Sequence, residues 1–87
     1  MFYTYVLQSI KDKEMYIGYT NNLERRLSEH NRGFNFSTKH GKPWKLIYCE
    51  VCLNDNDAKR REKYLKTSQG RRLLKRRIKD YLYSQNI

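Results

Sequence analysis

Residues 15–31 read MYIGYTNNLERRLSEHN, and this stretch decides the fold class. Four of its first five residues are aromatic, β-branched or small, which favours a β-strand over 15–19. The next three residues, TNN, are types that cap helices, and the apolar positions that follow have a helical period. We therefore expect a helix over 23–31. A strand that passes directly into a helix predicts a domain with both kinds of element.

The flanking segments extend this pattern. Residues 2–9 form a second β-branched and aromatic run, and a short polar connection joins them to 15–19, which predicts an antiparallel hairpin. The expected order is β-β-α-β-α-α in one domain over 1–87, an α/β (α+β) fold with a small three-stranded, mainly antiparallel sheet flanked by helices. The later elements are expected as a polar, basic loop over 33–43, a strand over 44–53, a helix over about 57–66 and a last helix over about 71–83.

Charge indicates the partner. The chain has 87 residues, with 19 Lys and Arg against 9 Asp and Glu, for a net charge of +10. Such a domain attracts polyanions, which favours nucleic acid, although charge of this kind also keeps small domains soluble. No apolar run approaches the roughly 20 residues of a membrane span, and no signal-peptide pattern opens the chain. We expect a cytoplasmic protein without a membrane partner.

Cys49 and Cys52 have the spacing of a metal-binding pair. They lie within the predicted strand, where residues three apart point to opposite faces and cannot grip one ion. We expect buried, reduced thiols at both positions, with no zinc site.

Two polar residues of the first predicted helix lie on or beside its apolar face. Leu23 and Leu27 mark that face, His30 falls beside them in angle, and Arg26 falls just to one side. Arg26 and His30 are four residues apart, so their side chains are neighbours. A histidine on an apolar face is either a packing residue or a functional one, and the sequence leaves both interpretations open.

On the next predicted helix, Glu62 is likewise a polar residue on the apolar face. It falls in angle between Ala58 and Leu65, which define the apolar face. A carboxylate there is costly unless it is paired, hydrogen-bonded or bound to a metal. The alternatives are a structural ion pair between Glu62 and Arg26, or a functional site.

Together these residues resemble the signature of the GIY-YIG nucleases. The second half of that signature matches residues 16–27, YIGYTNNLERRL, and His30, whereas the first half corresponds to residues 3–5, YTY. Residues 58–66, AKRREKYLK, resemble the family's helix that carries a metal-binding glutamate. The similarity runs from Phe2 to about Tyr81. It is strongest to the stand-alone, single-domain bacterial members and extends to the nuclease domain of the excision-repair protein.

The resemblance implies a function and a set of roles. Glu62 would bind a single Mg²⁺ (or Mn²⁺), Arg26 would bind the scissile phosphate, and His30 would support them or handle a proton. Either Tyr5 or Tyr16 would help to activate the attacking water. The implied activity is a metal-dependent endonuclease that hydrolyses phosphodiester bonds in DNA, structure-selective or weakly sequence-specific, in repair or recombination. Protein partners would supply any further targeting.

Basic residues outside these motifs are candidates for nucleic-acid contacts. A basic face of this kind follows the phosphate backbone without reading sequence, although many charged helices are merely solvated. A non-catalytic nucleic-acid-binding module with the same fold is the alternative function, and an RNA substrate stays open. The candidates are Lys39 and Lys42 in the loop, and Arg71, Arg72, Lys75, Arg76 and Lys79 on the last helix.

Overall fold

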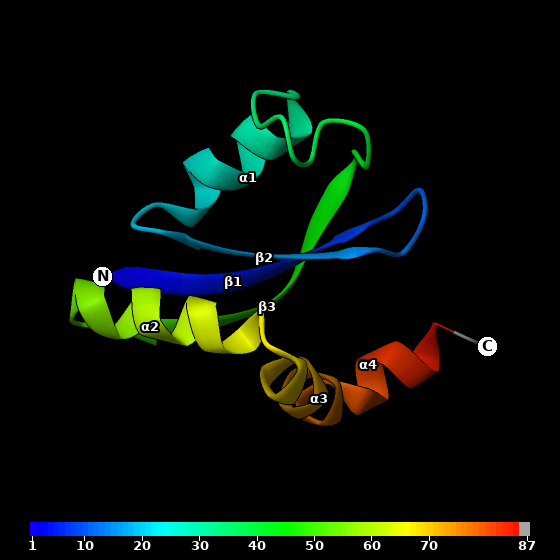
Figure 1. Ribbon diagram of the computed structural model, residues 1–87. Coiled ribbons are helices and arrows are strands. Elements are labelled where there is room, and N and C mark those ends of the chain that lie inside the picture. The colour runs from blue at the N-terminus through cyan, green and yellow to red at the C-terminus, as the bar shows by residue number, and fades with distance from the viewer. Residues whose placement is uncertain (86–87) are drawn as a thin grey trace.

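A three-stranded sheet forms the centre of the molecule (Figure 1). The computed structural model describes residues 1–85. Its strands are β1 (Phe2–Ser9), β2 (Met15–Thr20) and β3 (Trp44–Cys52). The strand order is β2-β1-β3, and β1 pairs antiparallel with both neighbours. The expected antiparallel sheet is confirmed, and the first strand of the chain occupies its centre.

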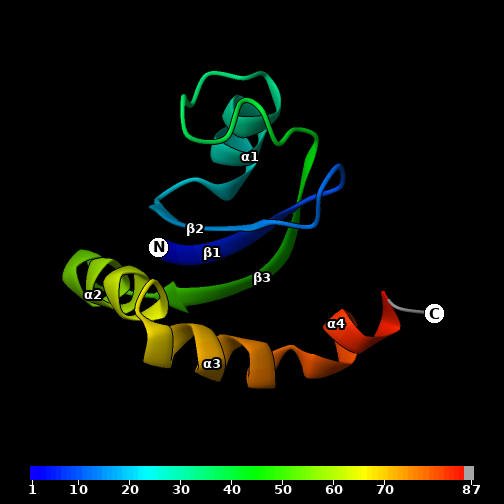
Figure 2. The same ribbon diagram turned by 45° about the vertical axis from the view of Figure 1, so that its right-hand side comes forward.

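Helices cover the two faces of this sheet unequally (Figure 2). Helix α1 (Leu23–Asn31) packs alone on one face, and its bounds are those that the sequence predicted. Asn22 is its N-cap, and its side chain accepts a hydrogen bond from the backbone N–H of Arg25. The helices α2 (Asp55–Leu65), α3 (Ser68–Arg77) and α4 (Lys79–Ser84) lie on the other side.

Alternation along β1 gives each face its own apolar core. Tyr5 and Leu7 point towards α1, where they pack with Trp44. Val6 points the other way into a cluster with residues of β2, α2 and α3. On that side the buried Thr4 hydroxyl donates to the carbonyl of Ala58 at 2.8 Å, which fastens α2 to the sheet.

The end of the chain differs from the expected single helix. We expected a break at residues 67–70, but Thr67 caps α3 and its side chain accepts from the N–H of Gly70. The interruption comes instead at Ile78, whose φ of −113° and ψ of 29° separate α3 from α4. The order is therefore β-β-α-β-α-α-α.

Gly70 lies inside α3 because of a close contact. A Cβ added there would lie 1.9 Å from the carbonyl oxygen of Tyr64, at the end of α2. The glycine was interpreted as a helix breaker, whereas it allows the start of α3 to approach the end of α2. A sequence pattern shows the glycine but not the neighbour that requires it.

Candidate active site

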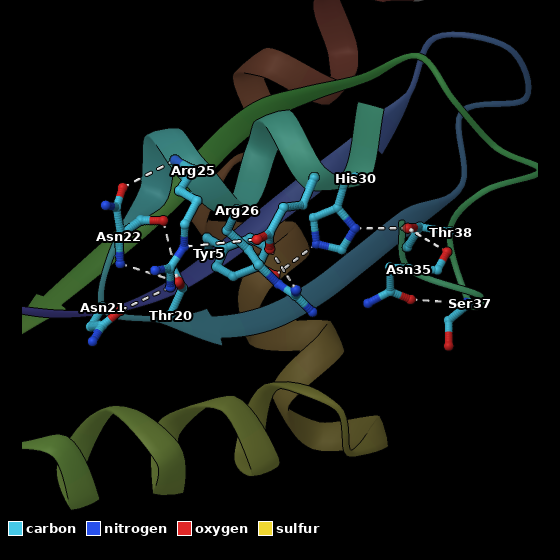
Figure 3. A network of polar contacts seen from close by, with 11 residues as sticks. Tyr5, Thr20, Asn21, Asn22, Arg25, Arg26, His30, Asn35, Ser37 and Thr38 are labelled. Atoms are coloured by element: carbon cyan, nitrogen blue, oxygen red, sulfur yellow. Dashed lines mark hydrogen bonds and ion pairs between the residues drawn. The ribbon is translucent and has the colours of Figure 1, made fainter. Parts of the chain in front are cut away.

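Three buried side chains form a hydrogen-bonded chain between the sheet and α1 (Figure 3). The Tyr5 hydroxyl lies 2.9 Å from Nε2 of His30, and Nδ1 of His30 lies 2.7 Å from the Thr38 hydroxyl. Tyr5 comes from β1, His30 from the last turn of α1, and Thr38 from the loop that follows. His30 is fully buried, as its place on the apolar face predicted.

The shifted pKa values of His30 and Tyr5 leave both groups uncharged. Burial, assisted by the positive charge of Arg26, lowers the pKa of His30 from 6.5 to about 4, so its imidazole is neutral. Burial raises the pKa of Tyr5 to about 12 against the opposing effect of Arg26, so the phenol keeps its proton. The Thr38 hydroxyl is directed at the carbonyl oxygen of Asn35, 3.5 Å away, so we assign the N–H of His30 to Nδ1, which donates to Thr38. Nε2 is then free to accept from the Tyr5 hydroxyl.

The neutral His30 predicts an acid-sensitive fold. An unfolded histidine binds a proton below a pH of about 6.5, whereas His30 in the folded protein binds one only near 4. Between these values the unfolded state holds more protons, so acidification costs on the order of 2–3 kcal/mol of folding free energy. Urea unfolding of the protein and of His30→Gln will measure this. The difference in stability between them should shrink as the pH falls from neutral to 4, and a constant difference would contradict a neutral buried imidazole.

Gly18 explains the geometry of Tyr5. The two residues are partners across β1 and β2, and a Cβ at Gly18 would lie 2.4 Å from both Cζ and Oη of Tyr5. The Tyr5 ring thus occupies the space that a side chain at position 18 would fill. Tyr16, two residues earlier on the same face, packs edge-on against His30 with ring centroids 5.0 Å apart.

Replacing this glycine should therefore damage the site more than the fold. In Gly18→Ala the Tyr5 ring must move, which separates its hydroxyl from His30 and lowers activity by about 10²-fold. Overpacking should reduce the unfolding free energy by about 1–3 kcal/mol. Cleavage rates below the melting temperature, compared with Gly41→Ala, which crowds Trp44 instead, will separate the two effects. Equal loss in both variants would refute a specific role for Gly18.

Arg26 lies beside Tyr5, at the margin of the apolar face of α1. Its Nη1 donates to Glu29 Oε1 at 2.9 Å, and about a third of each side chain is exposed. Both residues line a cleft of about 260 Å³ with the start of α1. The alternative ion pair between Arg26 and Glu62 is wrong, because Arg26 pairs with Glu29 while Glu62 pairs with Lys66 at 3.1 Å.

Glu62 lies on α2, on the other side of the sheet from α1. Its negative charge contributes to the raised pKa of Tyr5, so the carboxylate lies within electrostatic reach of that hydroxyl. Its side chain is 22% exposed and therefore accessible to an ion. Among residues 1–85 no three His, Cys, Asp or Glu side chains gather to hold a metal. This donor set suits Mg²⁺, which commonly takes one or two carboxylates and completes its shell with water and phosphate oxygens.

The candidate basic residues separate into two groups. Lys39 and Lys42 belong to the loop after α1, on the Tyr5–His30 side. The other five lie on α3 and α4, across the sheet from α1 (Figure 2), so the structure does not bring them to Tyr5 and His30. Two grooves there contain some of them: one of about 440 Å³ with Arg71 and Lys75, and one of about 610 Å³ with Arg76.

Sequence reasoning missed two residues of the site. Thr38 lies in a loop without periodicity, so nothing indicated that it would reach His30. Glu29 lies away from the apolar face of α1, so its position on the helix did not single it out. Its spacing of three residues from Arg26 is the usual spacing of a helical ion pair and could have identified it.

A buried tyrosine and histidine, an adjacent arginine and a partly exposed carboxylate are thus the candidate site residues of this chain. Residues 1–76 match the model of the GIY-YIG catalytic domain, and the chain belongs to this family. The resemblance in the sequence is thereby confirmed. Membership assigns the chain to a class of nucleases, which act on nucleic acid and generally use a divalent metal ion.

The chain is also similar to bacterial proteins of comparable length. The UPF0213 protein CPE1444 of Clostridium perfringens is 43% identical over 67 residues, which cover 76% of this chain and 71% of that protein. The UPF0213 protein SH2523 of Staphylococcus haemolyticus is 38% identical over 74 residues, or 84% and 89% of the two chains. No solved structure gives a significant match. In residues 1–85, no helix has the length and apolar character needed to cross a membrane.

Proposed function

We propose that the protein is a Mg²⁺-dependent endonuclease that hydrolyses phosphodiester bonds in DNA, acting in repair or recombination. The observation that carries this proposal is the Tyr5–His30 hydrogen bond, with Arg26 beside it and the Glu62 carboxylate within electrostatic reach. We also propose a cytoplasmic location, where thiols such as the free Cys49 and Cys52 stay reduced.

Tyr5 and His30 would move the proton of the attacking water. The water oxygen forms a bond to phosphorus while one of its protons passes to Oη of Tyr5 and the phenol proton passes to Nε2 of His30. The bond from phosphorus to the leaving oxygen breaks, and that oxygen takes a proton from solvent water. His30 then returns its proton to Tyr5, and Tyr5 releases the proton taken from the attacking water to solvent. With a pKa raised to about 12, Tyr5 acts through this exchange and not as a standing phenolate.

Positive charge would stabilise the reacting phosphate. Arg26, oriented by Glu29, offers its remaining N–H groups to a phosphate oxygen in the cleft at the start of α1. A divalent ion held at Glu62 would supply the second positive charge where negative charge develops. The phosphate charge also offsets the effect of Arg26 on His30, which makes His30 a better proton acceptor when substrate is bound.

Cleavage of defined DNA substrates tests this function. End-labelled single strands, flaps, forks and duplexes are incubated with the purified protein and Mg²⁺, Mn²⁺ or EDTA. We expect cutting with either metal and none in EDTA, with unequal rates across the substrates. Cutting that persists in EDTA, or uncut substrates in every condition, would overturn the proposal.

One observation favours the alternative, a non-catalytic nucleic-acid-binding module. The ion pair of Glu62 with Lys66 already compensates the carboxylate without a metal. A binding module would shift the mobility of the same DNA substrates in EDTA and leave them uncut in Mg²⁺. Lys66→Ala distinguishes the two functions further. Loss of the ion pair frees Glu62, which should lower the metal concentration needed for cutting in a nuclease and have no such effect in a binding module.

A further inference from the structure

The loop over residues 32–43 exposes two large aromatic rings. Phe34 is 65% exposed and Phe36 is 81% exposed. Single exposed apolar residues are common on proteins, but two phenylalanines separated by one residue in a polar loop are a concentrated apolar surface. Neither ring belongs to the two apolar cores.

Each ring carries a cation beside one face. The guanidinium carbon of Arg32 lies 4.6 Å from the centroid of the Phe34 ring, and Nζ of Lys39 lies 4.7 Å from that of Phe36. A cation held over a ring is attracted by its π electrons. The loop thus presents two repeats of one arrangement, an open aromatic surface with a positive charge next to it. That is the pair of groups a nucleotide requires, one for the base and one for its phosphate.

Hydrogen bonds hold the loop in this shape. Gly33, with φ of +78°, turns the chain away from α1 in the left-handed region that glycine tolerates. The carbonyl of Asn35 accepts from the N–H groups of Thr38 and Lys39. The Asn35 side chain accepts from the N–H of Ser37. Trp44 donates its indole N–H to the carbonyl of Thr38 at 2.8 Å. The two rings are therefore exposed by an ordered loop.

The loop is attached directly to the candidate active site. Thr38 contacts His30 at 2.7 Å, and His30 contacts Tyr5 at 2.9 Å, so one imidazole separates the loop from the reacting hydroxyl (Figure 3). Phe36 is two residues from Thr38, a backbone reach of at most about 7 Å. A strand whose phosphate lies at Tyr5 and Arg26 would thus have neighbouring nucleotides within reach of the two rings.

We propose that Phe34 and Phe36 are stacking platforms for two unpaired bases of the strand being cut. This inference rests on the proposed nuclease function and specifies its substrate class as single strands, flaps or unpaired ends. Bases inside a duplex have both π faces covered by their neighbours, so an aromatic ring reaches them only after unstacking. Stacking on aromatic side chains tolerates any sequence, because every base has a π face.

Binding in EDTA tests the platforms separately from cutting. Fluorescence anisotropy measures the affinity for a short labelled oligothymidylate, an abasic oligomer of the same length and a blunt duplex. We expect Phe36→Ala to weaken binding of the oligothymidylate by about 5- to 150-fold, and Phe34/Phe36 double substitution to weaken it further. Affinity for the abasic oligomer should change little. Phe36→Trp should restore binding, whereas Phe36→Leu, equally apolar, should not.

Leu53→Ala is the matched control, because Leu53 is 84% exposed and lies outside the loop. Unchanged oligothymidylate affinity in Phe34→Ala and Phe36→Ala overturns the inference, and if the wild type still cuts DNA the proposed function survives it. Equal loss on the abasic oligomer also overturns it, since the rings would then not contact bases. Self-association in sedimentation, or binding to anionic vesicles, that these substitutions abolish would assign the surface to another partner and overturn it as well.

Discussion

Glu62→Gln is expected to reduce metal-dependent cleavage by at least about 10²- to 10³-fold while leaving nucleic-acid affinity in EDTA unchanged. The substitution keeps the size of the side chain but removes the charge that would hold the ion. The ion pair with Lys66 is partly exposed, so its loss should alter stability little. Single-turnover cleavage rates, anisotropy in EDTA and melting temperatures measure the three quantities.

Asp57→Asn is the matched control for this experiment. Asp57 lies on the same helix, and its carboxylate makes an exposed ion pair with Arg60. Removal of that charge should leave cleavage within about twofold of the wild type, because Asp57 is not among the groups that act on Tyr5. If Glu62→Gln cleaves at the wild-type rate, Glu62 is not part of the site, and the proposal that its single carboxylate holds the metal ion is wrong.

Tyr5→Phe is expected to lower the single-turnover rate by about 10²- to 10⁴-fold, the usual contribution of a positioned acid–base group. The ring still packs between β2 and α1, but no hydroxyl remains to exchange protons with His30. Nε2 of the buried His30 also loses its donor, which should cost about 1–3 kcal/mol of stability. Quenched time courses under single-turnover conditions measure the cleavage rate, and urea unfolding measures the loss of stability.

Tyr81→Phe is the control for a loss of stability that leaves the cleavage rate unchanged. The Tyr81 hydroxyl donates to Gln8 at 2.6 Å on the opposite side of the sheet from Tyr5. This variant should lose stability but keep its cleavage rate at temperatures where it is folded. If Tyr16→Phe abolishes cleavage and Tyr5→Phe does not, the roles assigned to the two tyrosines are reversed.

Local signals in the sequence predicted the elements whose boundaries depend on nearby residues. Helix α1 begins and ends where the capping cluster and the apolar period place it, and His30 is buried because the same period turns it inward. Helix α3 begins three residues earlier than expected. Gly70, interpreted as a breaker, lies inside it, where a side chain would collide with the carbonyl of Tyr64 at the end of α2. That collision depends on the angle between the two helices, which no local pattern shows.

The candidate site was only partly predictable for the same reason. Tyr5 and His30 could be placed on faces of their own elements, but their hydrogen bond depends on how α1 packs on the sheet. The resemblance supplied Gly18 as part of a motif, whereas the contact with the Tyr5 ring shows why a side chain is excluded there. Thr38 and the exposed phenylalanines depend on the fold of a loop that no periodic pattern describes.

The contact between Trp44 and Thr38 gives the protein an internal optical reporter. Trp44 is the single tryptophan of the chain, it is 7% exposed, and its indole N–H is bound to the loop beside His30. Its emission therefore comes from one place in the molecule. If the loop is displaced, the indole should gain water and its emission maximum should shift to longer wavelength. Loop movement during nucleic-acid binding can thus be timed by stopped-flow fluorescence without a label.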